Sequence, residues 1–459
     1  MNSGDSSNLI LENVVSLAKR RGFAYPTSEI YGGLANSWDF GPLGVLLKNN
    51  IRDFWWKHFV LDREDMVGID ASIFLNPKVW EASGHVANFT DALIDCKNCH
   101  HRTRADHLIE DNFPDIKVEG LPTTKLDEII KEKKIKCPVC GEFNWTTVRK
   151  FNQLFETSIG ILEESKSKAY LRGEIAQGIF LNFKNVLNTT RVKIPFGIAQ
   201  IGKAFRNEIT MGQFLHRTLE FDLMEFEYFI PKEGWENKYL MWQEEMLSFA
   251  KNLGLNDKNL RFREHEEFER SHYSQKTMDL EYKYPFGWKE MFGLAYRGDF
   301  DLKNHANATG AKLTYTDLQS GETFIPHVIE PTFGLSRLVG IVLFDAYVQD
   351  GKRTVLKLDP KIAPYKAAVF PLLANKEELV KKANNIYQHL KKKFQTYFDD
   401  RGNIGKRYLY QDEIGTPFCI TVDFESLASD DVTIRHRDTT KQERVSIENI
   451  ENFLKSHIL

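Results

Sequence analysis

Hydrophobic positions near the start of the chain recur at the spacing of a helix. One face of the segment that ends at Gly22 carries Leu11, Val14, Val15 and Ala18. Pro42 suits the first turn of a second helix, which carries an apolar stripe of Leu43, Leu46, Leu47, Ile51, Phe54 and Trp55. The pattern therefore predicts two amphipathic helices, and by pattern alone the second is a buried core helix.

Residues 204–229 contain two strand-like runs separated by a turn-rich piece at 210–213. Side chains two positions apart share a face of a strand, so Arg206 and Glu208 point the same way. By the same period, the return run places on one face Arg217, Leu219, Phe221, Leu223 and Glu225. An antiparallel hairpin would line one surface with two cations, an aromatic ring and two carboxylates. Such a surface suits phosphate, a planar base and an ammonium group, although a solvated hairpin with ion pairs fits the spacing equally well.

A strand-like run leads into an apolar helix over residues 327–348, with a turn expected at Pro331 and Gly334. Glu330 would then lie at the end of the strand and Arg337 in the first turns of the helix. A helix N-terminus and a guanidinium favour phosphate, and a nearby carboxylate can hold Mg²⁺. A strand, a turn and a helix with one arginine is a common arrangement, so this pattern needs support from elsewhere.

Four of the five cysteines form two C-x-x-C pairs, which are Cys96 with Cys99 and Cys137 with Cys140. Two such pairs can supply four thiolates to a tetrahedral zinc ion. A helix is expected between them at 123–135, and His100 and His101 are substitute ligands. The alternative is paired thiols without a metal. Since no open coordination position is evident, a zinc ion here would be structural rather than catalytic.

The C-terminal part of the chain predicts a separate unit. Residues 349–365 contain two prolines and are expected to form a linker. A buried strand at 367–373 follows, then an amphipathic helix at 375–394 and further alternating strands and helices, which suggests an α/β domain. Cations gather in this unit: Arg401, Lys406, Arg407, Arg435, Arg437, Lys441 and Arg444. They form either a solvated face or a surface for nucleic acid.

Length and composition narrow the class of protein. A chain of 459 residues favours two or three domains. A net charge of −3 argues against a sequence-blind nucleic-acid coat. The chain contains no apolar run long enough to span a membrane and no secretory signal pattern, so we expect no membrane partner. Five cysteines do not form a disulfide scaffold, and a reducing, cytoplasmic setting fits them.

Three segments resemble the signature motifs of class II aminoacyl-tRNA synthetases. Phe-Arg-x-Glu at 205–208, followed by Arg-x3-Phe-x3-Glu at 217–225, is similar to motif 2. Residues 30–60, with Pro42, are similar to motif 1, which builds the dimer interface in that family. Residues 327–348 resemble motif 3. The motifs occur in the family's order.

Further segments resemble glycyl-tRNA synthetase of the homodimeric type. They are WEASGH at 80–85, RADHLIE at 104–110, FNQLFETSIG at 151–160 and YLRGEIAQGIFLNFKNV at 170–186. The C-terminal unit resembles the anticodon-binding domain that several class II synthetases share. The resemblance implies an α+β fold, with a class II antiparallel-sheet catalytic domain at 1–358. It also implies a cysteine-bearing insertion at about 92–148 and a C-terminal α/β anticodon-binding domain at 365–459.

The resemblance also assigns residues to roles. It implies that Arg206 grips the α-phosphate of ATP, that Arg337 meets the γ-phosphate and that Glu330 serves Mg²⁺; these three are the expected catalytic residues. Phe221 would stack on the adenine. Further ATP contacts are expected from Asn207, Glu208, His216, Arg217, Glu290, Met291 and Gly334. The glycine pocket is expected to include Arg104, Glu174, Phe221, Glu225, Glu330, Thr332 and Gly334.

The implied reaction is the activation of glycine by ATP, giving glycyl-adenylate and pyrophosphate, followed by transfer of glycine to tRNA(Gly). The implied partners are tRNA(Gly), glycine, ATP with Mg²⁺ and a second copy of the chain. Four positions depart from the family pattern and bear on affinity: Gln153, Gly173, Leu219 and Thr332. Two alternatives stay open, a class II synthetase for another small or polar amino acid and a non-catalytic, nucleic-acid-binding accessory protein.

Overall fold

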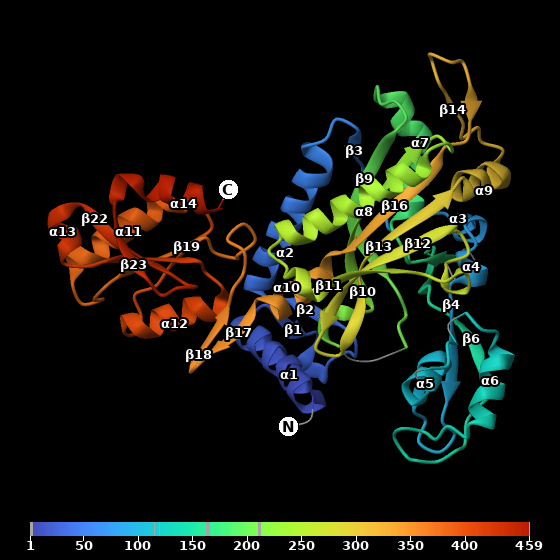
Figure 1. Cartoon of the computed structure of the whole chain (residues 1–459), viewed down its shortest axis with the longest axis horizontal. Coiled ribbons are helices and arrows are strands. Elements are labelled where there is room, and N and C mark those ends of the chain that lie inside the picture. The colour runs from blue at the N-terminus through green and yellow to red at the C-terminus, as the bar shows by residue number, and fades with distance from the viewer. Residues whose placement is uncertain (1–2, 114, 119, 162–165, 210–212, 459) are drawn as a thin grey trace.

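The computed structural model describes residues 3–113, 115–118, 120–161, 166–209 and 213–458. Within them the largest sheet has seven strands, in the order β11-β12-β13-β16-β10-β9-β3 (Figure 1). Its strands are β3 (Met66–Gly68), β9 (Phe196–Phe205), β10 (Glu220–Ile230), β11 (Leu260–Glu264), β12 (Lys276–Tyr284), β13 (Gly287–Gly298) and β16 (His327–Gly334). Neighbouring strands are antiparallel except β3 and β9, so the fold is a mixed α/β architecture rich in antiparallel pairing.

One face of this sheet carries the main hydrophobic core. The helices that pack on it are α1 (Ser3–Arg21), α2 (Pro42–Trp56), α8 (Trp235–Asn252) and α10 (Leu335–Ala346). Trp55 of α2 is fully buried and touches the ring of Phe226 on β10. The predicted helix that begins at Pro42 is confirmed as α2, and Gly254 follows α8 with a positive φ of 86°.

Strand β10 divides its side chains between the two faces of the sheet. Met224, Phe226, Tyr228 and Ile230 belong to the main core. Because side chains alternate along a strand, Glu225 and Glu227 point to the opposite face. That face is covered by α7 (Ala176–Thr189) and α9 (Phe300–Thr309), and this is where the polar site described below lies.

The predicted hairpin is confirmed, but its loop is longer than expected. β9 ends at Phe205 and β10 begins at Glu220, so Arg206, Glu208 and Arg217 lie in the loop rather than on the strands. The predicted turn falls partly on residues 210–212, which lie outside the described residues. The turn expected at Pro331 is wrong, because β16 continues through it to Gly334. Its neighbour β13 pairs with Pro331 directly.

A smaller unit lies beside the central sheet at residues 90–152 (Figure 1). Its described strands form a three-stranded sheet, β4 (Thr90–Asp95), β5 (Arg102–Arg104) and β6 (Arg149–Asn152). Two helices, α5 (Ala105–Asn112) and α6 (Thr123–Glu132), bury Leu108 and Leu126 against that sheet in a separate small core. The predicted helix between the cysteine pairs is therefore confirmed as α6.

The C-terminal part forms another sheet, with five described strands in the order β20-β19-β21-β22-β23. They are β19 (Ala367–Pro371), β20 (Thr396–Phe398), β21 (Phe418–Val422), β22 (Asp431–His436) and β23 (Gln442–Ser446). Its helices are α11 (Glu377–Leu390), α12 (Ile404–Ile414), α13 (Glu425–Ser429) and α14 (Ile450–Ile458). Ala367 and Val369 pack with α11 and α14, while Ala368 and Phe370 pack with α12, so the helices lie on opposite faces.

The predicted linker at 349–365 is only partly correct. A hairpin of β17 (Tyr347–Asp350) and β18 (Arg353–Leu356) occupies its first half. Arg353 of β18 contacts the fully buried Asp412 of α12 at 3.2 Å, and Arg435 donates to both oxygens of Asp412 at 2.8 and 2.9 Å. The hairpin is therefore joined to the C-terminal sheet by a buried ion-pair network.

The remaining described elements are short. They are β1 (Ala24–Pro26), β2 (Trp38–Phe40), α3 (Pro77–Ala82), α4 (His85–Asn88), β7 (Glu156–Ile159), β8 (Ser167–Tyr170), β14 (Tyr315–Thr316) and β15 (Thr323–Phe324). No helix among the described residues combines the length and hydrophobicity needed to cross a bilayer.

Candidate active site

A cavity of about 200 Å³ opens where the loop after β9 meets the start of α10. Many of the predicted ATP and glycine residues line it together: Arg104, Arg206, Glu208, His216, Arg217, Phe221, Glu290, Thr332, Gly334 and Arg337. The predicted residues that do not line it are Asn207, Met291, Glu174, Glu225 and Glu330. The side chain of Met291 is buried in the main core.

Arg206 is held in place at one wall of this cavity. Its Nε donates to the carbonyl of Gly173 at 3.0 Å. Its guanidinium lies 5.5 Å from the ring centre of Phe221 and 5.2 Å from that of Phe89. A guanidinium fixed beside an aromatic ring can contact a phosphate while the ring remains available to a planar base.

Arg337 lies on the opposite wall, in the first turn of α10. Its Nη1 is 2.9 Å from Oε1 of Glu290 and donates to the carbonyl of the same residue at 3.1 Å. Burial, and then the charges of Arg337, Arg217 and Lys289, hold the pKa of His216 well below its ordinary value. The cavity therefore contains fixed guanidinium charges and a neutral imidazole, a composition that suits a polyphosphate.

A buried polar cluster lies beside the cavity, on the face of the sheet that carries Glu225. Its centre is Arg297 of β13, which is fully buried. Arg297 donates to both oxygens of Asp301, at 2.7 and 2.8 Å, and to Glu330 at 2.9 Å. Asp299 is the N-cap residue of α9, and Arg297, at the end of β13, pairs with Asp301, four positions further along the chain.

Glu174 belongs to the same cluster and is fully engaged. One oxygen accepts from Gln177 at 2.8 Å, and the other lies 3.2 Å from Nε2 of His85. Burial alone would raise the pKa of Glu174, but the charges of His85 and Arg297 outweigh it and hold the pKa well below its ordinary value. Glu174 is therefore an ionised carboxylate that already has partners.

Glu225, in contrast, is poorly satisfied. Its Oε2 accepts only a long hydrogen bond, 3.4 Å, from the hydroxyl of Thr332, and its Oε1 has no partner among the described residues. Burial, and then the charges of Glu330 and Glu174, raise its pKa well above the ordinary value. One oxygen of this carboxyl group is therefore free to accept a hydrogen bond, for example from the ammonium group of a ligand.

The unpartnered oxygens form a pattern. Among the described residues, every buried side-chain oxygen without a hydrogen bond belongs to Gln200, Glu225 or Glu227. Gln200 of β9 pairs directly with Glu225 of β10, so the two side chains lie on the same face. All of these atoms can accept a hydrogen bond, and no donor among the described residues reaches them.

Sequence reasoning gave no site role to Arg297, Asp301, Gln177, His85 and Glu227. The indication that the sequence offers for such residues is their charge. Charged residues interrupt segments that are otherwise apolar and buried, as Glu227 does in the run MEFEYF. The carboxylate of Glu330 accepts a hydrogen bond from Arg297 and does not line the cavity. Its magnesium role and its place in the amino-acid pocket both stay predictions.

The four cysteines of the two pairs come together in the smaller unit. The Sγ atoms of Cys96 and Cys140 are 3.6 Å apart, as are those of Cys99 and Cys137. A disulfide would require about 2.05 Å, whereas four thiolates about 2.3 Å from one zinc ion lie roughly 3.8 Å apart. The cluster therefore has the spacing to hold a metal ion, and the substitutes His100 and His101 are not part of it.

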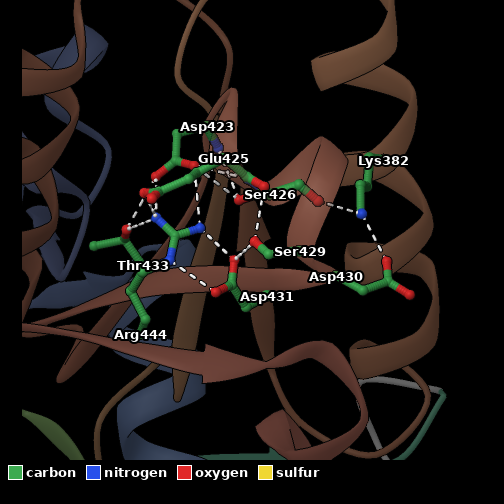
Figure 2. Close-up of polar contacts among 9 residues, drawn as sticks. All are labelled: Lys382, Asp423, Glu425, Ser426, Ser429, Asp430, Asp431, Thr433 and Arg444. Atoms are coloured by element: carbon green, nitrogen blue, oxygen red, sulfur yellow. Dashed lines mark hydrogen bonds and ion pairs between the residues drawn. The ribbon is translucent and has the colours of Figure 1, made fainter.

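The C-terminal arginines differ from the expectation of a shared cationic face. Arg407, Arg435 and Arg437 are buried and bonded within the domain. Figure 2 shows Arg444 enclosed by the carboxylates of Asp423, Glu425 and Asp431. These four arginines are structural. Lys406 and Lys441 are exposed.

Comparison with known proteins agrees with this arrangement. Residues 366–457 match the family model described as an anticodon binding domain, and residues 118–153 match the model of glycyl-tRNA synthetase insertion domain 1. A mixed α/β fold with this C-terminal domain, beside a cavity suited to a polyphosphate, defines the class as an aminoacyl-tRNA ligase.

The full chain identifies the family. It is 51% identical to the glycine–tRNA ligase of Caldanaerobacter subterraneus subsp. tengcongensis over 98% of both chains. It is 50% identical to that of Geobacillus thermodenitrificans over the whole of both chains, and 50% identical to that of Clostridium kluyveri over 98% of both. The chain belongs to the glycine–tRNA ligase family. These relatives favour neither a different amino-acid substrate nor a non-catalytic role.

Proposed function

We propose that the protein activates glycine with ATP and Mg²⁺ and transfers the glycyl group to tRNA(Gly). The observation that carries the proposal is the group of buried oxygens around Glu225 that no donor among the described residues reaches, beside a cavity with fixed guanidinium groups. A primary ammonium group supplies three donors and a positive charge. The alternating faces of β10 place Glu225 and Phe221 on the same side, so an amino acid bound at one lies close to a nucleotide bound at the other.

The first chemical step is an in-line displacement at the α-phosphorus. An oxygen of the glycine carboxylate forms the new bond to phosphorus, and the bond to the bridging oxygen of pyrophosphate breaks. Arg206 and Arg337 neutralise charge that develops on the phosphates, and no side chain needs to form a covalent bond. In the second step a ribose hydroxyl of the tRNA attacks the glycyl carbonyl, and AMP leaves.

Selection of glycine must be steric, because glycine has no side chain to bind. One extra methylene changes binding by only about 1–3 kcal/mol in an adaptable apolar pocket. Thr332 lies on β16 directly opposite Glu225, and its hydroxyl contacts that carboxyl group. We propose that the methyl group of Thr332 narrows the space beside the α-carbon and excludes alanine and serine.

The domain organisation we propose is a class II catalytic domain at 1–358, interrupted by an insertion at about 92–148, and an anticodon-binding domain at 365–459. In the insertion, Cys96, Cys99, Cys137 and Cys140 would hold one zinc ion that stabilises the unit. Since these thiols need a reducing setting, we propose that the protein acts in the cytoplasm.

We also propose a homodimer, formed through α2 and the segments beside it. Large apolar side chains near β1 are strongly exposed: Ile30 by 92%, Tyr31 by 87% and Leu34 by 59%. Exposed apolar side chains that gather in one region are typical of a protein interface. A monomer mass by light scattering at micromolar protein would overturn this proposal.

The decisive experiment is ATP–pyrophosphate exchange with glycine, alanine, serine, threonine, proline and histidine in turn. Exchange with glycine alone supports the proposal, and exchange with another amino acid keeps the chemistry but changes the substrate. Absence of exchange with all six would favour the accessory protein. Within the same assay, Glu225→Gln is expected to raise the KM for glycine, and an unchanged KM would refute the role of Glu225.

A further inference from the structure

His216 has a hydrogen-bond partner in the core to which the proposed mechanism assigns no role. The residue ends a short helical turn, η4 (Phe214–His216), and lines the cavity that contains Arg206 and Arg337. Its ring also contacts Tyr284 of β12, which is buried in the main core. Nδ1 of His216 is 3.2 Å from the hydroxyl oxygen of Tyr284, and the two rings meet edge to face with their centres 4.9 Å apart. The imidazole therefore connects the core to the cavity.

The surroundings of Tyr284 determine the direction of this hydrogen bond. Among the described residues, the hydroxyl of Tyr284 has no other hydrogen-bond partner. If Nδ1 of His216 donated a proton to the hydroxyl oxygen, the buried O–H group would be left without an acceptor, which is costly. If the hydroxyl donates to Nδ1, both groups are satisfied. Burial raises the pKa of Tyr284, so the hydroxyl keeps the proton that it donates.

Donation to Nδ1 determines the state of the other ring nitrogen of His216. Burial, and then the charges of Arg337, Arg217 and Lys289, hold the pKa of His216 well below its ordinary value, so the ring is uncharged. An uncharged imidazole has a single N–H group, and an accepting Nδ1 leaves that proton on Nε2. Nε2 has no hydrogen-bond partner among the described residues. His216 therefore offers a neutral donor to a ligand in the cavity.

We infer that Tyr284 is a positioning residue that fixes the tautomer of His216, and that His216 donates from Nε2 to the outer phosphates of ATP. Arg337, the residue expected at the γ-phosphate, donates from Nε to the carbonyl of His216 at 3.4 Å, so the two side chains lie on the same wall. A neutral donor among guanidinium groups adds a hydrogen bond without adding repulsion between like charges. The opposite tautomer would direct a lone pair of Nε2 at the phosphate oxygens. The inference rests on the proposed function and adds a residue that touches no substrate.

Removal of single hydroxyl groups tests the role of Tyr284. Tyr284→Phe removes the hydroxyl and keeps the ring in the core. Tyr282→Phe is the matched control, because Tyr282 lies two positions earlier on β12 and its hydroxyl donates to Asp345 at 3.0 Å, and neither of these residues lines the cavity. Only Tyr284→Phe should raise the KM for ATP, by about fivefold, and the KM for glycine should change in neither variant. A rise of equal size in both variants, or no rise in Tyr284→Phe, would overturn the inference.

Amide side chains at position 216 identify the nitrogen that donates. His216→Gln places an amide N–H group near the position of Nε2, whereas His216→Asn places one near the position of Nδ1. Measured by calorimetry, His216→Gln should bind ATP within about threefold of the unaltered protein, and His216→Asn about tenfold more weakly. AMP lacks the outer phosphates and should bind equally to all three proteins. Tighter binding of ATP by His216→Asn than by His216→Gln, or an equal loss for AMP and ATP, would contradict the inference.

Nitrogen NMR of protein with isotopically labelled histidines observes the tautomer without any reaction. Protonated and unprotonated imidazole nitrogens resonate far apart, and His216→Gln identifies the signals of His216. We expect a proton on Nε2 and none on Nδ1, and a weaker preference in Tyr284→Phe. A proton on Nδ1 would refute the inference alone, even where glycine-dependent exchange proceeds. A protein that has the expected tautomer and binds ATP, but exchanges with no amino acid, would refute the proposed function and leave the role of Tyr284 intact.

Discussion

The guanidinium of Arg297 lies 2.9 Å from the carboxylate of Glu330, and neither residue lines the cavity that contains Arg206 and Arg337. Arg297 also stacks on Tyr273, with 3.6 Å between the guanidinium and the ring centre. This arginine balances the carboxyl groups that surround it. Its contacts therefore control how much negative charge remains for an incoming ammonium group.

Replacing Arg297 by methionine should test this balance. The change leaves Asp301 and Glu330 buried without a counterion, so we expect a loss of roughly 3–5 kcal/mol in the free energy of unfolding. Denaturant unfolding measures it. Arg149→Met is the control, because Arg149 is 48% exposed and pairs with Asp95 at the surface, and it should cost about 1 kcal/mol or less. Equal losses for the two variants would contradict the assigned role of Arg297.

Glu330 predicts a dependence of stability on pH. Burial, opposed by Arg297 and reinforced by the charge of Glu174, raises its pKa from 4.5 to about 7. The folded protein thus keeps a proton that the unfolded chain releases, so the stabilisation from this group is present below pH 4.5 and is lost as the pH rises through about 7.

Unfolding of the unaltered protein and of Glu330→Gln should be compared across this range. Glutamine cannot release a proton. Between pH 4.5 and about 7, the unaltered protein should therefore lose about 3 kcal/mol in the free energy of unfolding relative to Glu330→Gln. Parallel pH profiles would show that Glu330 does not titrate in that window.

The sequence was informative where local chemistry determines structure. Apolar spacing predicted α1 and α2, and the run from Ala204 to Phe229 predicted the β9–β10 hairpin. It could not reveal which partner a buried charge takes. Arg297 and Asp301 are four positions apart, but the contact of Arg297 with Glu330 requires β13 and β16 to lie side by side, a pairing between residues more than thirty positions apart. Such pairings depend on tertiary packing rather than on local pattern.

The same limit explains the C-terminal cations. Arginines that looked like one basic surface are divided among buried ion pairs, carbonyl contacts and the acidic enclosure of Arg444 (Figure 2). Burial cannot be read from a charge count, because an arginine between apolar residues can pair with a carboxylate from a distant element, as Arg435 does with Asp412. The cysteine cluster could be predicted from the sequence alone, since the spacing within each pair indicates a metal-binding turn.

Arg337 should matter for activation more than for amino-acid binding. It is anchored to Glu290 at the cavity wall, where it can meet the outer phosphates. We expect Arg337→Ala to lower the rate of ATP–pyrophosphate exchange by about 10²–10³, as removal of one fixed charge-stabilising donor does. Arg102→Ala, which removes an arginine that is 58% exposed in the smaller unit, is the control and should keep the rate. A decrease below fivefold for Arg337→Ala would argue against a role at the phosphates.

The cysteine cluster predicts about one zinc ion per chain by elemental analysis of the purified protein. Cys137→Ser should lower that content and loosen the small core around α6, detectable as faster proteolysis of the region 90–152. Cys419→Ser is the matched control, because Cys419 is buried in the C-terminal sheet and belongs to no cluster among the described residues. Zinc content that is unaffected by Cys137→Ser would favour unmetallated thiols.

The exposed lysines of the C-terminal domain predict where the tRNA backbone binds. The ammonium groups of Lys406 on α12 and Lys441 before β23 have no ion pair among the described residues. Charge reversal at each lysine should raise the KM for tRNA in aminoacylation. It should also reduce the number of counterions released on tRNA binding, measured from the salt dependence of the affinity, by about one. ATP–pyrophosphate exchange, which needs no tRNA, should not change.

Lys381 provides the control for this surface. It is exposed on α11, which packs on the face of the C-terminal sheet opposite to α12. If the tRNA backbone follows the α12 face, Lys381→Glu leaves the KM for tRNA unchanged while Lys406→Glu raises it. The reverse result would place the backbone on the α11 face. Equal effects of both substitutions would indicate that the lysines act through the net charge of the domain, since a localised phosphate contact depends on which face carries the cation.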